Sequence, residues 1–200
     1  MIASPPSSAP ASSPLSEAHL RELAGANETL RKIRRVVSIA RFDGWTVAVF
    51  AGLTALFGLT NPVALVVAFV MACIGVIELR GAQRLERLDP RAARTLGLNQ
   101  LALGALLILY ALGQIHAELT GPGVYDTLAA GDPHLARMLK PVKELTHTVT
   151  LAAYASLVLV ALVAQGGLAR YYFTRRKLID AYLLNTPSWI TAVQRTSIAA

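Results

Sequence analysis

The side chains most suited to metal chemistry are gathered in one polar stretch between residues 116 and 147. Imidazole and carboxylate groups are ligands of Zn²⁺ and Cu²⁺, so this stretch could in principle bind either ion. The spacing, however, fits neither a pair of ligands one helical turn apart nor an HExxH helix. We therefore expect a solvated loop with no metal site. The residues concerned are His116, Glu118, Asp126, Asp132, His134, Glu144 and His147.

Five polar side chains are distributed along two of the apolar stretches and could face a shared cavity if several copies assembled. It comprises Gln114, Thr148, Tyr154, Ser156 and Gln165. Cys73 is the only cysteine, so no disulfide forms within the chain, and we expect it to be a small packing residue.

Motifs for enzymatic chemistry are missing from the sequence. It contains no GxSxG, no P-loop, no GxGxxG and no CxxC, and no Ser/His or Cys/His pair with a plausible common location. We therefore predict a protein that is not an enzyme, with no catalytic residue and no cofactor.

The elements that carry these residues are apolar helices long enough to span a bilayer. From Gly44 to Ile77 there is no Asp, Glu, Lys, Arg or His. One helix of that length would measure about 51 Å, against roughly 30 Å of hydrocarbon, so the chain must turn, and Asn61-Pro62 is the expected place. Two more charge-free stretches follow, and we predict an all-α polytopic membrane protein with four spans at 44–60, 62–79, 96–115 and 147–169.

The basic residues predict the orientation of these spans. Going along the chain, the segments outside the spans hold six, zero, five, three and five Lys or Arg residues. Because cytoplasmic loops are enriched in Lys and Arg, both termini and the basic loop at 80–95 are expected in the cytoplasm, and the loop at 116–146 outside. The net charge of +7 is then explained by anionic lipid rather than by nucleic acid.

The two arms of 44–77 are near the lower length limit for spanning. They could cross fully or form a re-entrant hairpin, and charge bias does not separate these alternatives, because the ends of the hairpin lie on one side in both. We favour full spans, since a re-entrant backbone must be buried in protein or line a water-filled cavity.

Two cytoplasmic segments flank the spans. Residues 1–15, rich in Pro, Ser and Ala, are predicted to be a disordered tail. Residues 16–43 are predicted to form an amphipathic helix, because an a/d stripe recurs every three or four residues. Its apolar face could lie on the membrane, pack against the helix after span 4, or pair with another protein. The stripe is Leu23, Ala26, Leu30, Ile33, Val37 and Ala40.

Residues 170–200 are predicted to be a basic helical tail, and its helix is expected to end at Asn185-Thr186-Pro187. Pro141 suits the first turn of the helix that leads into span 4, and Asp132-Pro133 a helix start within the outer loop. Contacts with lipid or a partner are expected at Arg31, Lys32, Arg34, Arg35, Arg175, Arg176, Lys177, Tyr182 and Trp189.

Rows of small residues in the spans predict close helix packing. They are Ala48 and Gly52; Ala64, Ala68 and Ala72; Gly97, Gly104 and Ala111; and Ala152 and Ser156. No charged residue lies within the apolar stretches, which argues against a proton-coupled carrier. We therefore expect an accessory or structural protein that binds membrane subunits or anionic lipid in a bacterial inner membrane, a location suggested by the high Ala, Leu and Arg content. The alternative is a small oligomeric channel or carrier for a neutral solute.

Overall fold

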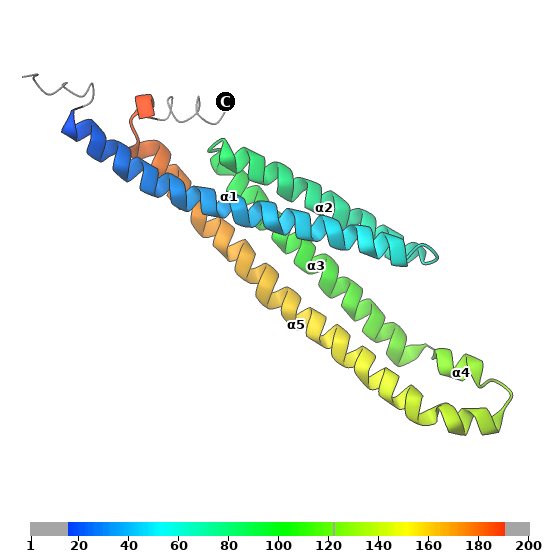
Figure 1. Cartoon of the computed structure of the whole chain (residues 1–200). Coiled ribbons are helices and arrows are strands. Elements are labelled where there is room, and N and C mark those ends of the chain that lie inside the picture. Colours follow the sequence, from blue (N-terminus) through cyan, green and yellow to red (C-terminus); the bar gives the residue numbers. More distant parts are fainter. Residues whose placement is uncertain (1–15, 122, 191–200) are drawn as a thin grey trace, which may run out of the picture.

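The computed structural model describes residues 16–121 and 123–190, and within them it contains helices and no strand (Figure 1). The helices are α1 (Glu17–Phe57), α2 (Pro62–Glu86), α3 (Pro90–Thr120), α4 (Val124–Leu128) and α5 (Pro133–Asn185). All except the short α4 contain a stretch long and apolar enough to cross a membrane. The predicted all-helical class with four candidate spans is thus confirmed. The predicted tail at 1–15 and the last ten residues of the predicted 170–200 segment lie outside the described residues.

Three of the long helices begin with the same signal, an Asn or Asp followed by Pro. The side-chain oxygens of Asn61, Asp89 and Asp132 each accept a hydrogen bond from a backbone N–H of the first helical turn, at 3.0, 2.9 and 2.8 Å. Proline fits directly after such a cap, because a first-turn N–H has no helical partner to lose. The helix start expected at Asp132-Pro133 is confirmed.

The segment 80–95 is mostly helical, in contrast to the loop expected from the sequence. α2 continues to Glu86 and α3 begins at Pro90, so only residues 87–89 connect them. Leu88 in this connection has φ of 62°, a left-handed conformation that costs a leucine about 1–2 kcal/mol. Its side chain is only 4% exposed, and burying a leucine contributes about 1.5–3 kcal/mol, which offsets that cost.

Helix α5 also differs from the expectation at its beginning. It runs unbroken for 53 residues from Pro133, so Pro141 lies inside the helix rather than in its first turn. The helix end expected at Asn185-Thr186-Pro187 is confirmed, with Thr186 as the C-cap.

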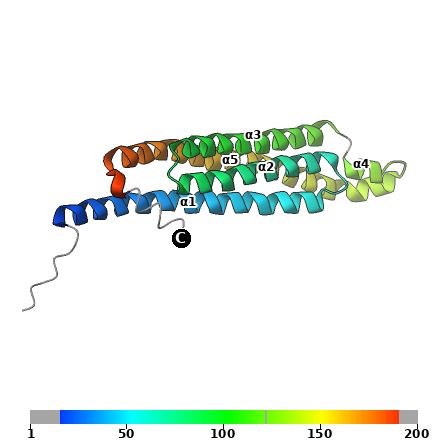
Figure 2. The same ribbon diagram turned by 90° about the horizontal axis from the view of Figure 1, so that it is seen from above.

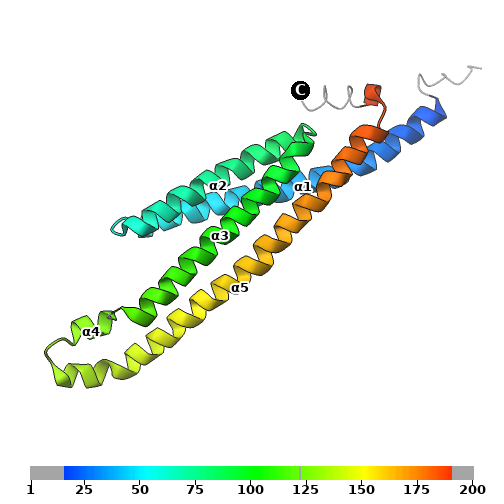
Figure 3. The same ribbon diagram turned by 180° about the vertical axis from the view of Figure 1, so that it is seen from behind.

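The four long helices form two hairpins that converge at one end. α1 packs along α2, and α3 packs along α5, while the short 87–89 turn joins the hairpins. Seen from above in Figure 2 the helices run alongside one another, but Figures 1 and 3 show that the α1–α2 and α3–α5 hairpins diverge away from the 87–89 turn. A four-helix arrangement therefore exists only near that turn.

The main core lies at the converging end and includes the amphipathic half of α1. Ala26, Leu30, Ile33, Val37 and Ala40 are each at most 8% exposed and share one cluster with residues of α2, α3 and α5. The apolar face of this segment is consequently covered by the protein itself. Of the three alternatives for this face, packing against the end of α5 is confirmed, and lying on the membrane surface is wrong.

Only some of the rows of small residues are buried at contacts between helices. Gly97, Gly104 and Ala111 are all buried along α3, and a Cβ added at Gly104 would lie 3.1 Å from the Cβ of Gln165 on α5. Several members of the other rows are exposed, namely Gly52, Ala72, Ala152 and Ser156. Cys73 is also exposed, so it is not the packing residue expected from the sequence.

At Gly75 the backbones of α1 and α2 approach closely. A Cβ there would lie 3.3 Å from both the backbone nitrogen of Ala48 and the backbone oxygen of Gly44. Because backbone atoms cannot turn aside as a side chain can, any larger residue must push the two helices apart.

We expect Gly75→Leu to lower the free energy of unfolding by about 1–3 kcal/mol through overpacking. The measurement is the thermal midpoint of the purified protein in mild detergent. Gly52→Leu in the same hairpin is the matched control, since nothing lies within 4 Å of a Cβ added at Gly52. Equal midpoints for the two variants would contradict the close approach.

Candidate functional site

The most unusual site in the described residues is a group of polar side chains buried where the four long helices converge. We call it the polar junction, and it consists of Asp43 from α1, Glu78 from α2, Asn99 and Gln100 from α3, and Tyr172 from α5. Glu78, Gln100 and Tyr172 are 0% exposed and Asn99 is 5% exposed, whereas Asp43 is half-buried. A buried carboxylate is costly unless it is hydrogen-bonded or paired, so its contacts decide what the site can do.

The hydrogen bonds of the polar junction cross from one hairpin to the other. The Asn99 carboxamide nitrogen donates to Glu78 Oε2 at 2.7 Å and to the backbone oxygen of Ile74 at 3.0 Å. The Gln100 carboxamide nitrogen donates to Asp43 Oδ2. Both carboxylates belong to the α1–α2 hairpin and both amide donors to the α3–α5 hairpin, so these bonds join the hairpins at the point from which they diverge.

Three buried atoms of the junction have no hydrogen bond of ordinary geometry to any described residue. They are Glu78 Oε1, Gln100 Oε1 and the Tyr172 hydroxyl oxygen. Gln100 and Tyr172 nevertheless lie close enough to Glu78 to interact with it electrostatically. The interior of the junction therefore presents unused oxygen atoms around a fully buried carboxyl group.

The sequence alone did not point to this site. Asp43 and Glu78 directly flank the charge-free 44–77 stretch, and Asn99 and Gln100 lie near the beginning of the span predicted at 96–115. The available signal was helical phase, because Glu78 follows Met71 and Ile74 and precedes Ala82 at spacings of three or four, and all three neighbours are buried. A proton-coupled carrier was disfavoured because no charged residue lies within the apolar stretches. Glu78 is a fully buried ionisable residue, so this reason no longer holds.

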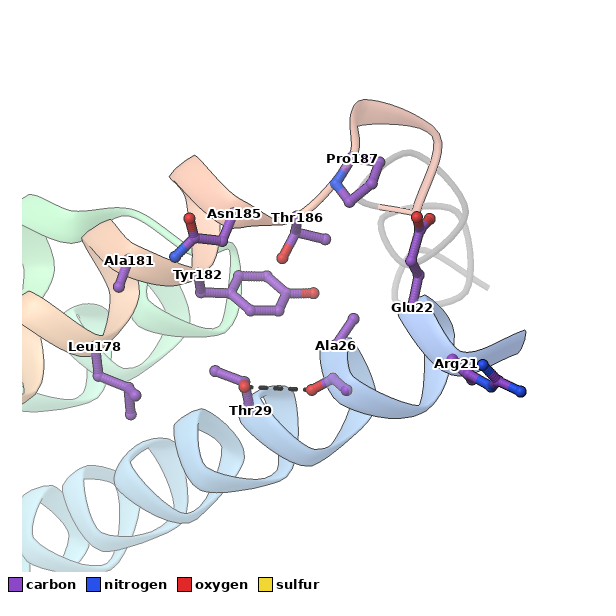
Figure 4. Close-up of a pocket in the computed structure, with 11 residues that line it drawn as sticks. Arg21, Glu22, Ala26, Thr29, Leu178, Ala181, Tyr182, Asn185, Thr186 and Pro187 are labelled. Carbon is purple, nitrogen blue, oxygen red and sulfur yellow. Dashed lines mark hydrogen bonds between the residues drawn. The ribbon is translucent and has the colours of Figure 1, made fainter. Parts of the chain in front are cut away.

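A second candidate is a pocket of about 330 Å³ between the first turns of α1 and the end of α5 (Figure 4). Figure 4 shows the Tyr182 ring pointing into it, with Ala26 and Thr29 on one side and Asn185 and Thr186 on the other. Tyr182 is 3% exposed, and Trp189 packs against the same core and edge-on against His19, with ring centroids 5.6 Å apart. In the folded chain these two aromatic residues hold α5 to α1, so the structure does not offer them to a partner.

The basic residues expected to contact lipid or a partner lie mainly on the surface. Arg31, Lys32, Arg34 and Arg35 are all exposed on the side of α1 that faces away from the core. Near the end of α5, Arg175 is half-buried with its guanidinium 4.9 Å from the centroid of the Tyr171 ring.

Beyond Arg175, Arg176 Nε lies 3.6 Å from Asp180 Oδ2, and Lys177 is exposed. Both basic groups therefore flank the converging end of the hairpins, one on α1 and one on α5.

The five polar residues expected to line a cavity are distributed along α3 and α5 in the single chain. Tyr154 packs edge-on against Tyr110, and Gln165 packs against Gly104. Gln114 is half-buried, while Thr148 and Ser156 are exposed. One copy therefore brings only some of them toward the α3–α5 contact.

The polar residues of the outer segment form pairs. His147 Nδ1 lies 3.0 Å from Glu118 Oε1, and Lys143 Nζ lies 2.5 Å from Asp126 Oδ1. The hydrogen bond from Lys143 holds the pKa of Asp126 below its ordinary value, and the backbone N–H of Gly123 adds to this effect. Within the described residues there is no group of three His, Cys, Asp or Glu side chains arranged to hold a metal ion.

Comparisons with protein-family models, with curated proteins and with solved structures find no match for this chain. Its function is therefore argued from the physical features of the fold and the polar junction.

We expect Asn99→Leu to destabilise the protein by about 1–3 kcal/mol, because it leaves Glu78 Oε2 buried without its donor. Glu78→Leu combined with Asn99→Leu should recover most of the loss, since apolar residues that replace a buried polar pair together are often neutral or stabilising. Denaturation in mild detergent measures both variants. Additive losses in the double variant would show that the two side chains do not interact.

Proposed function

We propose that this protein is a non-enzymatic, multi-pass protein of a bacterial cytoplasmic membrane, with both termini in the cytoplasm. It would act as an accessory or structural subunit that binds anionic lipid and a membrane partner. The observation that carries the membrane part of this proposal is the exposure of large apolar side chains on helices of both hairpins. Phe57, Phe69 and Leu109 are 83%, 69% and 70% exposed, which favours an apolar surrounding.

The distribution of charge supports the orientation. Exposed Arg31, Lys32, Arg34 and Arg35 lie on the half of α1 that packs at the converging end, and Arg176 and Lys177 lie near the end of α5 that packs there too. Anionic head groups of the cytoplasmic leaflet attract Lys and Arg close to the membrane surface, by about 1 kcal/mol for each residue. The converging end is therefore the end that we place in the cytoplasm.

A free helix face on α5 is the best candidate for the partner contact. Thr148, Ala152 and Ser156 recur every four residues and are all exposed. Ala161 is 2% exposed and lies on the side of α5 that packs against α3. It follows Ala152 by about two and a half helical turns, so the row of small residues lies on the opposite face of α5. A row of small residues lets a second helix approach closely, and no described residue of this chain covers it.

The oligomeric channel or carrier remains the second candidate, and the same face of α5 favours it. Exposed Thr148 and Ser156 would then line a passage between copies. This alternative predicts a homo-oligomer without a foreign partner, together with solute flux into liposomes that contain the purified protein.

The partner proposal is tested by purifying the protein from its native membranes in mild detergent, identifying co-purifying proteins and lipids by mass spectrometry, and measuring the intact mass. We expect a stoichiometric partner, and we expect Ala152→Leu with Ser156→Leu to reduce its recovery at least about tenfold, equivalent to about 1.4 kcal/mol.

Ala153→Leu with Ala164→Leu, two exposed positions on another side of α5, is the matched control and should leave recovery unchanged. Full recovery with the Ala152 and Ser156 variant would reject this face, and a pure homo-oligomer would transfer the proposal to the channel.

The topology of the α1–α2 hairpin is tested separately. From Gly44 to Phe57 the apolar part of α1 rises about 20 Å, which is short against a hydrocarbon core of roughly 30 Å. With full spans, Asn61→Cys in a Cys73→Ser background should react with an impermeant thiol reagent added to intact cells, whereas Gln83→Cys, near the cytoplasmic end of α2, should not. Protection of both cysteines would favour the re-entrant hairpin.

A further inference from the structure

The carboxyl group of Glu78 is buried without a basic partner. No ion pair in the described part of the chain involves Glu78 or Asp43. The groups that interact with Glu78 are Asn99 and Gln100 from α3, Asp43 from α1 and Tyr172 from α5. Asp43 is a second acid, and the others are neutral amides and a phenol. Two negative charges here would repel each other with no cation to balance them.

The hydrogen-bonding groups of the junction are short of donors. Both N–H groups of the Asn99 carboxamide are used, on Glu78 and on the Ile74 carbonyl. The orientation of the Gln100 carboxamide is fixed, because its oxygen cannot face the Asp43 carboxylate and its nitrogen must. Glu78 Oε1 and Gln100 Oε1 are left as buried acceptors, and the only donors of the junction without a hydrogen bond of ordinary geometry to a described residue are the second N–H of Gln100 and the Tyr172 hydroxyl.

We propose that the polar junction is a proton-binding site, in which Glu78 takes up one proton on Oε1, the carboxyl oxygen that has no hydrogen bond of ordinary geometry to any described residue. The step adds a proton from solvent to the carboxylate and forms an O–H bond, with no other bond broken. It turns an unpaired acceptor into a donor and removes one negative charge. Asp43, the half-buried member, is the place where the junction meets the protein surface.

A proton fits this site better than a metal ion. Ca²⁺ takes six to eight oxygen ligands and Mg²⁺ takes six. The three buried unused oxygens of the junction, together with Oδ1 of Asp43, fall short of that number, and the Asn99 nitrogen occupies the second oxygen of Glu78. A bound proton needs only one carboxyl oxygen, which Glu78 supplies.

The consequence is that protonation of Glu78 controls the contact between the hairpins. Glu78 and Asp43 lie on one hairpin, and their polar neighbours lie on the other. The protonated junction has one negative charge less between the hairpins, and the deprotonated junction has an uncompensated charge there. The inference requires no partner protein and therefore stands apart from the accessory role proposed above.

The test is infrared spectroscopy of the purified full-length protein in lipid nanodiscs during a pH titration. We expect a C=O stretching band of a buried protonated carboxylic acid that rises and falls reversibly with pH and is lost in Glu78→Gln. Glu86→Gln is the matched control, two turns along α2 at a residue that pairs with Arg41 at 3.0 Å on the surface, and it should retain the band. Persistence of the band in Glu78→Gln, or its absence from the natural protein at every pH at which the protein stays folded, would overturn the proposal.

A second measurement separates a proton from a metal ion and guards against misfolding of the variant. A glutamine at position 78 can accept from Asn99 and is neutral and of the same shape as the protonated acid, so Glu78→Gln should keep the thermal midpoint of the natural protein. Sodium, potassium, magnesium and calcium chlorides should leave the midpoint unchanged relative to choline chloride of equal ionic strength. A rise with one of these cations in the natural protein that disappears in Glu78→Gln would overturn the proposal in favour of a metal site.

Discussion

The register in which the two helical hairpins pack is constrained by a carboxyl group buried between them. Glu78 is fully buried on α2, and Asn99 on α3 supplies its hydrogen bond at 2.7 Å. Removing water from a carboxylate costs several kcal/mol, and an unpaired one would drive the hairpins apart. Because the donors lie on the opposite hairpin, the two halves of the chain can bury this group only by packing together in one register. The polar junction thus fixes which residues of α1 and α2 face α3 and α5.

This constraint also explains the shape of the molecule. On the 87–89 side of the junction, the apolar stripe of α1 packs against α2, α3 and the end of α5, and water is excluded without help from lipid. On the other side, the cores are smaller and large apolar residues face outward. One end held together by its own core, and a more exposed part that lipid or another helix would complete, fit the accessory subunit that we propose.

The junction places an ionisable group at the boundary between these two parts. A proton bound there would act on the contact between the hairpins, and hence on the divergence of α3 and α5 from α1 and α2. The exposed row at Thr148, Ala152 and Ser156 lies on the diverging portion of α5. A change in that divergence would therefore move the part of α5 to which a partner would bind. In this way the proposed proton site and the proposed partner surface would be connected through α5.

The sequence by itself determined the number of long helices, some of their ends and their apolar character, because these depend on local signals: charge-free length, Asn-Pro or Asp-Pro starts, and the Asn185-Thr186-Pro187 stop. The same signals could have revealed the helix start at Asp89-Pro90. Only the tertiary structure decided that the stripe of α1 packs inside the protein, that Tyr182 is buried and Trp189 half-buried against the core, and that Glu78 meets Asn99. These facts depend on contacts between residues distant along the chain, and a charged residue at the end of an apolar stretch has the same local signature whether it faces water or a hydrogen-bond donor on another helix.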